Sequence, residues 1–209
     1  MANKKFPRVE KYLRRYGKFI VNQAKSIIKK KGRNDSGNLL RSLKYVLKEK
    51  NGKFDIEFLS ARHGEFIDKG VQGLGKSILP PGSTAGQHGG AKMMPNRTYI
   101  DADTGKRKRS PYRFRMGKNG TSNMRPDLMQ NYVMRKGISI PNEDGSSMSI
   151  KSMAYIIGRA IKAKGIQGIS FYSQPVAAFT NQFRIELMQE FERDVLDQII
   201  IRKRKSGNI

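Results

Sequence analysis

A phosphate-binding loop is the one catalytic motif that residue types and spacing suggest. Residues 70–77 read Gly-Val-Gln-Gly-Leu-Gly-Lys-Ser, which fits G-x-x-x-x-G-K-[ST]. In that motif backbone N–H groups cradle phosphates at the start of a helix, and the Lys and Ser contact the phosphates and Mg²⁺. The surroundings argue against it, because residues 65–69 are not a buried strand and Pro80-Pro81 stops a helix within a turn. We interpret the match as chance.

The other candidate ligands and nucleophiles form no recognisable site. His63 and His88 stand in turn-like surroundings, and no HExxH pattern exists. The chain has no Cys, and no Ser stands in G-x-S-x-G. Two acidic pairs lack the ligand density of a calcium loop and are typical of surface turns: Asp101 with Asp103, and Glu143 with Asp144. We therefore expect no enzyme activity, no metal and no cofactor.

Positive charge is the more informative feature. The 209 residues include 42 Lys+Arg against 17 Asp+Glu, a net charge of +25. Such a chain attracts polyanions, and neutralising phosphates gives affinity for nucleic acid without reading its sequence. A cluster interleaved with Tyr112 and Phe114, together with a basic tail, supplies the expected contact residues for nucleic acid or a partner: Lys106, Arg107, Lys108, Arg109, Arg113, Arg115, Lys118, Arg202, Lys203, Arg204 and Lys205. The alternative is a charged loop packed against an acidic neighbouring subunit.

Hydrophobic periodicity in the first third predicts a helix followed by a hairpin. Apolar residues at steps of three and four predict the helix over about residues 6–31, which carries eleven Lys/Arg among residues 1–31 and one acid, Glu10. That basic side is either a solvated face or a face toward a polyanion. A strand Leu39–Glu49, the turn Asn51-Gly52 and a strand Phe54–Leu59 should follow, and then a short helix ending at Gly70.

The last third is expected to be mainly helical. Asp127 should cap a helix that ends at Gly137, and Ser149 should cap one that ends at Lys164-Gly165. A short strand is expected near Ile169 and Phe171. The longest helix should run from Pro175 to about Arg202.

Residues of about 71–126 predict a long irregular basic insertion within one domain spanning 1–209. Ten of the 21 Gly lie between 70 and 120, and eight of the ten Met lie between 93 and 153. The fold class is therefore expected to be α+β: a small antiparallel sheet packed with long N- and C-terminal helices. No apolar run approaches the roughly 20 residues that span a bilayer, and the N-terminus does not read as a signal peptide, so we expect no membrane contact.

Four segments carry a resemblance to a known family. Residues 35–43 (DSGNLLRSL) look like an S/T-G-x-L-x-x-S start to a first strand, and residues 65–70 (EFIDKG) look like a turn of aromatic, acid and Gly. Residues 128–140 are similar to a helix ending in Lys-Gly-Ile, and residues 154–166 (AYIIGRAIKAKGI) to an A-x-x-I-x-R-x-I-x-x-x-G-I helix. Together they resemble the head–tail connector and tail-completion (neck) proteins of tailed bacteriophages.

The resemblance implies a structural virion protein that forms a closed ring around a DNA channel in the neck. It implies homo-oligomeric contacts, neighbouring portal, connector or tail proteins, and non-specific contact with packaged DNA. The protein would reside in the virion, and in the host cytoplasm during assembly. The chain departs from the family in the size and charge of its insertion, which would reach adjacent rings and fill irregular interfaces with Met.

A free, sequence-independent nucleic-acid-binding protein of ribosomal or nucleoid type is the alternative. The net charge and the basic insertion fit it well. The acids that gather between Glu186 and Asp197 argue against it, because a protein that coats DNA would place basic residues there too.

Overall fold

The computed structural model describes residues 6–33, 36–50, 52–75, 97–115, 126–139, 141 and 145–206, with backbone alone for residues 200–206. These residues group into two compact units. The first unit holds the described residues of 1–64, 100–106 and 170–209, and the second holds those of 65–99 and 107–169. Helices and small antiparallel sheets make up both units, so the expected α+β class is confirmed.

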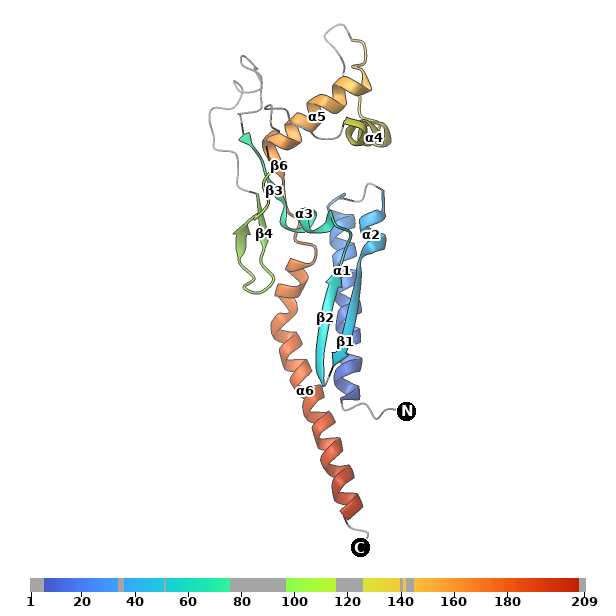
Figure 1. The fold of residues 1–209 in the computed structure, drawn as a ribbon, viewed down its shortest axis with the longest axis vertical. Coiled ribbons are helices and arrows are strands. Elements are labelled where there is room, and N and C mark those ends of the chain that lie inside the picture. The colour runs from blue at the N-terminus through green and yellow to red at the C-terminus, as the bar shows by residue number, and fades with distance from the viewer. Residues whose placement is uncertain are drawn as a thin grey trace. The chain divides into compact units, whose positions relative to one another are not determined.

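The first unit is built on two long helices and a hairpin (Figure 1). Helix α1 (Pro7–Lys30) contacts helix α6 (Ser173–Ser206) and both strands of the hairpin, β1 (Lys44–Lys50) and β2 (Lys53–Leu59). Because α1 has two neighbours, its buried stripe is wider than a single helix face. The buried apolar residues of α1 are Val9, Tyr12, Leu13, Ile20, Val21, Ala24 and Ile28.

Aromatic pairs join α1 to α6 along their length. The Phe19 and Phe179 rings meet edge to face with centroids 4.8 Å apart, and those of Tyr16 and Phe183 lie 4.2 Å apart. Nearer the end of α6, the rings of Phe6 and Phe191 lie 5.3 Å apart. Such pairs contribute about 0.5–1.5 kcal/mol each beyond their buried area, so this seam stabilises the unit.

The predicted hairpin is confirmed. Strands β1 and β2 pair antiparallel from Lys44 opposite Leu59 to Lys50 opposite Lys53, which leaves two residues for the turn. Gly52 has a φ of +75°, which a side chain would strain. At the open end, the Tyr172 hydroxyl donates to the Leu59 carbonyl at 3.0 Å, and this contact ties the hairpin to the start of the α6 segment.

The strand predicted over Leu39–Glu49 is wrong in its first part. Residues Asn38–Ser42 form the short helix α2, and β1 begins only at Lys44. Gly37 has a φ of +74° that turns the chain before residue 38, and the Arg41 N–H donates to the Gly37 carbonyl at 3.0 Å, so a helical turn replaces the start of the strand. Leu39 and Leu43 are both buried in this arrangement, at 4% and 3% exposure. The Ser42 hydroxyl donates to the Leu39 carbonyl and accepts from the Ala61 N–H, so it closes this turn against the end of β2.

The second unit contains two helices that share a core. Helix α4 (Pro126–Lys136) and helix α5 (Ile150–Lys164) enclose Val133, Met153 and Ala154, with four half-buried residues against them: Met129, Ile138, Met148 and Ile157. Three methionines, Met129, Met148 and Met153, therefore contribute to this core. Ser149 caps α5 as predicted, because its Oγ accepts from the Ser152 N–H at 3.1 Å. Asp127 lies inside α4, whose first residue is Pro126, so it is not the expected cap.

Short elements complete the second unit. Helix α3 (Gly64–Lys69) leads into strand β3 (Val71–Gln72), which pairs antiparallel with β6 (Gly165–Ile166). The strand expected at Ile169 and Phe171 is wrong, because Ser170 adopts a φ of +52° and the chain turns there. Two further strands, β4 (Thr98–Ile100) and β5 (Arg107–Arg109), pair with each other.

Gly17 provides a test of the packing between α1 and β1. A Cβ at this position would lie 2.5 Å from Cδ2 of the Tyr45 ring. We expect Gly17→Ala to lower the free energy of unfolding by about 1–3 kcal/mol through overpacking. The higher helix propensity of Ala offsets at most about 1 kcal/mol of this loss.

Urea unfolding of the single variant and of Gly17→Ala/Tyr45→Ala measures this effect. The steric cost should disappear when Tyr45 is truncated, so the alanine at 17 should then be neutral or stabilising. An equal loss in both backgrounds would contradict the packing that we describe.

Candidate nucleic-acid interface

The basic cluster lies on an ordered hairpin. The sequence indicated a loop, but Arg107–Arg109 form β5, paired with β4. Asp101 builds the turn: its Oδ1 accepts from the Thr104 N–H at 3.0 Å and from the Thr104 hydroxyl at 2.7 Å. The backbone N–H of Asp101 donates to the Lys106 carbonyl at 2.9 Å. Asp101 is therefore a buried turn former, which accounts for one of the acidic residues considered above as ligands.

Buried polar side chains hold the base of this hairpin. The Gln72 side chain donates to the Arg97 carbonyl at 2.6 Å and accepts from the Arg97 N–H at 3.0 Å. The Ser110 hydroxyl donates to the Gly70 carbonyl at 2.7 Å. Gln72 and Ser110 are 7% and 6% exposed, so these bonds are shielded from competing water. The residues just before β4 and just after β5 are thereby fixed to the β3 segment.

Tyr112 serves this attachment and does not present a free ring for stacking. Its ring meets Phe66 edge to face with centroids 4.7 Å apart, and its carbonyl accepts from the Gln72 N–H at 2.7 Å. The Tyr112 hydroxyl bonds the Glu65 carboxylate, and this bond, followed by the one from Lys69, holds the pKa of Glu65 below its usual range. The aromatic residue at position 112 is therefore explained by its packing and hydrogen bonds within the unit, and not by stacking on nucleic-acid bases.

The described cations of the cluster, which exclude Lys118, face solvent. In the alternating pattern of a strand, Arg107 and Arg109 project from one side of β5 and Lys108 from the other. Lys106, Arg113 and Arg115 are exposed as well. The arrangement concentrates positive charge without a helix that could enter a groove to read bases, and therefore suits contacts to phosphates.

The remaining predicted contact residues are not brought to this hairpin by any described contact. Lys118 lies outside the described residues. Arg202–Lys205 extend the backbone of α6, and their side chains also lie outside the described part.

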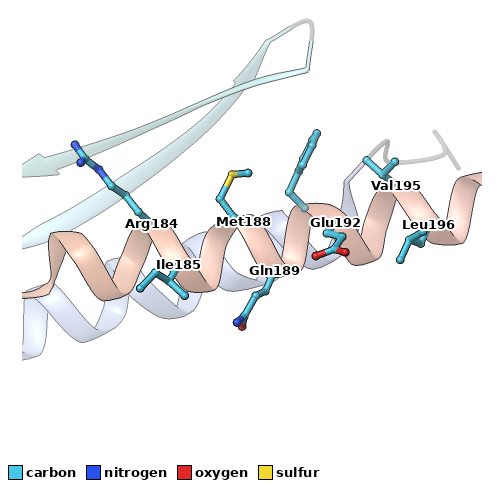
Figure 2. A pocket seen from close by; sticks show the side chains of 8 residues that line it. Arg184, Ile185, Met188, Gln189, Glu192, Val195 and Leu196 are labelled. Atoms are coloured by element: carbon cyan, nitrogen blue, oxygen red, sulfur yellow. The ribbon is translucent and has the colours of Figure 1, made fainter.

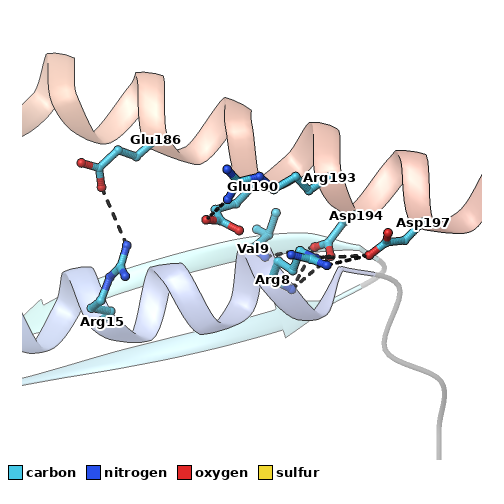
Figure 3. A network of polar contacts seen from close by, with 8 residues as sticks. All are labelled: Arg8, Val9, Arg15, Glu186, Glu190, Arg193, Asp194 and Asp197. Carbon is cyan, nitrogen blue, oxygen red and sulfur yellow. Dashed lines mark hydrogen bonds and ion pairs between the residues drawn. The ribbon is translucent and has the colours of Figure 1, made fainter.

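Acidic residues of α6 neutralise part of the basic side of α1, which the sequence did not predict. The Arg8 guanidinium binds Asp197 at 3.0 Å, and the Arg15 guanidinium lies 3.9 Å from Glu186 (Figure 3). Arg14 bonds Glu10 within α1 at 2.8 Å. Burial, and then the nearby Glu186 carboxylate, raise the pKa of Tyr12 to about 12, so this phenol stays protonated as a donor. The cluster of acidic residues between 186 and 197 was visible in the sequence. Which arginines of α1 these acids pair with is seen only in the three-dimensional structure.

Other cations of α1 remain exposed. Lys11, Lys18, Lys29 and Lys30 face solvent, and Lys31 and Arg33 follow them. The helix therefore keeps an exposed basic surface in addition to its arginine contacts with α6, and contact of that surface with a polyanion stays a prediction.

Asp194 makes the central contact between the two helices. Its carboxylate accepts from the Arg8 N–H at 3.0 and 3.2 Å and from the Val9 N–H at 3.0 Å. These N–H groups belong to the second and third residues of α1, which a side chain at the N-cap ordinarily satisfies. The N-cap here is Phe6, which has no such side chain. Asp194 is 2% exposed, so α6 caps α1 from a buried position.

Two glycines within residues 70–75, Gly70 and Gly73, lie against neighbouring backbone, whereas a Cβ at Gly75 would meet no atom within 4 Å. A Cβ at Gly70 would lie 2.5 Å from the Gly168 N atom, and one at Gly73 would collide with the Ala163 carbonyl. The N–H groups of Gln72 and Leu74 donate to the carbonyls of Tyr112 and Lys162, and so do not point freely at a ligand. Gly70 and Gly73 therefore permit close strand pairing, while Lys76 and Ser77 lie outside the described residues.

Among the described residues, no three His, Cys, Asp or Glu side chains gather to hold a metal ion. His63 is exposed, whereas His88 and the Glu143-Asp144 pair lie outside the described part. No described helix combines the length and apolar character needed to cross a bilayer.

Asp194→Ala tests the contact between α6 and α1. The change leaves the Arg8 and Val9 N–H groups without their acceptor, so we expect a loss of about 1–3 kcal/mol in the free energy of unfolding. Asp194→Asn keeps one acceptor oxygen and should lose less. Asp197→Ala is the matched control, because the Arg8–Asp197 pair is exposed and such pairs contribute at most about 1 kcal/mol. Equal losses for the two alanine variants, measured by urea unfolding, would contradict the capping role.

Comparison of the chain with protein-family models, curated proteins and solved structures finds no significant match to any of the three.

Proposed function

We propose that this chain is a non-catalytic structural protein that forms a ring in the neck or tail-completion region of a tailed bacteriophage, around the DNA channel. Its partners would be other copies of itself, neighbouring portal, connector or tail proteins, and packaged DNA. The proposal places the protein in the virion, after assembly in the host cytoplasm.

One observation carries the nucleic-acid part of this proposal. Exposed Lys106, Arg107, Lys108 and Arg109 stand on a hairpin whose base is fixed by buried Gln72 and Ser110. A hairpin that is already ordered loses less conformational entropy on binding than a flexible basic loop would. Cations without base-reading groups suit a DNA segment of any sequence, as in a channel through which the whole genome passes.

The resemblance supports the ring part. It implies a small antiparallel sheet with long N- and C-terminal helices, and α1, the β1–β2 hairpin and α6 have that order. Residues 36–43 of the first segment lie just before the hairpin, and residues 154–166 cover most of α5 and the whole of β6. Head-to-tail contacts between copies of the chain would form a ring if the rotation from each subunit to the next adds up to a full turn.

A free nucleic-acid-binding protein is the second candidate, and the net charge of +25 favours it. The use of Arg8 and Arg15 in contacts with acids of α6 counts against it. The charges of those arginines are partly neutralised within the chain, so it has fewer cations available for coating DNA than its composition indicates.

The mass of the purified protein separates the two candidates. Native mass spectrometry after nuclease treatment and at moderate salt should show a closed ring with a defined copy number. A monomer or dimer that forms no larger closed assembly and precipitates only when nucleic acid is added would favour the free nucleic-acid binder.

Arg107→Ser/Arg109→Ser tests the role of the hairpin. Both side chains are exposed, so the melting temperature should stay unchanged. If both arginines contact phosphates, the slope of log K against log salt for duplex DNA should fall by about 2, and affinity should fall for all sequences alike.

Lys50→Ser/Lys53→Ser is the matched control, since it removes the same charge from the exposed tip of the β1–β2 hairpin. Equal effects of the two double variants on DNA binding would show that total charge, and not this hairpin, governs the affinity. A lower melting temperature for Arg107→Ser/Arg109→Ser would assign these arginines a structural role.

A further inference from the structure

Helix α6 carries an apolar stripe that it does not use against α1. A shallow groove on this side is lined by residues of α6 alone: Arg184, Ile185, Met188, Gln189, Phe191, Glu192, Val195 and Leu196. Ile185 and Met188 are 61% and 65% exposed, and Phe191 and Leu196 are 43% and 49% exposed. Large apolar side chains grouped in this way are typical of an interaction surface and not of scattered exposed residues.

The stripe is separate from the side of α6 that builds the first unit. The side toward α1 carries Phe179, Phe183 and Asp194, which make the aromatic and capping contacts. Of the stripe residues, Phe191 also contacts Phe6 with part of its ring. The stripe therefore faces away from α1 over most of its length, as Figure 2 shows for Ile185 and Leu196.

The stripe consists of two rows. Arg184, Met188 and Val195 point to one side of the groove, and Ile185, Gln189, Glu192 and Leu196 to the other (Figure 2). Phe191 lies three residues after Met188 and four before Val195, so helical spacing places it in the first row. Each row combines apolar groups with at least one polar group.

The order of residues within the rows is self-complementary. In an antiparallel pair of helices related by a two-fold axis, each row runs opposite the same row of the second copy in reverse. With the axis near Glu190, Met188 lies opposite Phe191 of the second copy in the first row. In the second row, Ile185 lies opposite Leu196, and the Gln189 amide lies opposite the Glu192 carboxylate, to which it can donate. Every one of these contacts occurs twice.

Charge also favours a second copy as the occupant. Two chains of net charge +25 repel each other over most of their surface. The groove carries one cation, Arg184, and one anion, Glu192, so its net charge is zero. Arg184 lies opposite Val195 of the second copy, where its aliphatic part can cover the valine while its guanidinium stays in water.

We propose that this stripe is a self-association surface on which α6 pairs antiparallel with α6 of a second copy of the chain. The pairing goes beyond the proposed function and does not depend on it, because a free nucleic-acid binder would carry the same surface. It is a two-fold contact, so it differs from the head-to-tail contacts that close a ring.

Single-cysteine variants test the proposal, because the chain has no Cys of its own. In the antiparallel pair, the two copies of residue 189 are offset by about 3 Å along the helix axis, whereas those of residue 181 are about 27 Å apart. Gln189 and Asn181 are both exposed. We therefore expect a short bis-maleimide to cross-link Gln189→Cys into dimers, with little or no dimer from Asn181→Cys.

The cross-linking should be done on the full chain after nuclease treatment and at high salt, so that nucleic acid does not gather the copies. Equal cross-linking at both positions would indicate a parallel pair and would overturn the antiparallel arrangement. Failure of Gln189→Cys to cross-link would overturn the self-association itself, as expected if a different protein covered the stripe.

Met188→Glu gives a second, independent measurement. It places a carboxylate at the centre of the paired surface, so dimer dissociation measured by sedimentation equilibrium should become at least about tenfold easier. Because Met188 is exposed on the single chain, the far-ultraviolet circular dichroism should not change, whereas loss of the dimer should remove the concentration dependence of the melting temperature. Ile156→Glu is the matched control, since Ile156 is 46% exposed on α5 and lies outside the stripe. An unchanged dissociation constant for Met188→Glu would contradict the proposal.

Discussion

The carboxylate of Asp194 is the contact on which the arrangement of the first unit depends. A helix end leaves several backbone N–H groups without partners, and α1 has no local side chain to accept them. Asp194 accepts from two of these groups while being almost fully buried, so α1 and α6 are held in one relative position. The aromatic pairs and the Arg8–Asp197 contact then lie on the same seam. The effect of a substitution on α6 on the stability of the first unit should therefore depend on whether Asp194 can still accept from the Arg8 and Val9 N–H groups.

Charge in this protein is divided between two tasks. Arg8, Arg14 and Arg15 of α1 are paired with carboxylates, so their positive charge stabilises the chain itself. Arg107 and Arg109 are exposed on strand β5. The base of its hairpin is fixed by hydrogen bonds of the buried Gln72 and Ser110 side chains. The anchoring is hydrogen-bonded and buried, whereas the cations are solvated, so the hairpin can present charge without depending on it for stability. This separation allows DNA contact to be altered without unfolding the protein.

The local elements with strong signals were predictable from the sequence because their causes are local. Asn51-Gly52 indicated the hairpin, Ser149 indicated the start of α5, and hydrophobic spacing indicated α1 and α6. The errors occurred where long-range packing overrode a local pattern. Residues 38–42 form a helical turn whose Ser42 hydroxyl accepts from the Ala61 N–H beyond the hairpin, and β5 formed from Arg107–Arg109, a basic run with no apolar alternation. Gly70 belonged to an apparent nucleotide motif, but its close approach to the backbone of residues 166–168 explains it.

The sequence alone determined the composition of the candidate interface: a net charge of +25, a cluster from Lys106 to Arg109, and no Cys. These properties depend on residue type, which folding does not change. Only the tertiary structure decided which charges are exposed, because an arginine becomes part of the fold when a carboxylate from a distant segment reaches it. Asp194 lies 186 residues from Arg8, and no local pattern relates them. The same holds for the stripe on α6, because periodicity marks its apolar residues but only packing shows which of them α1 leaves uncovered.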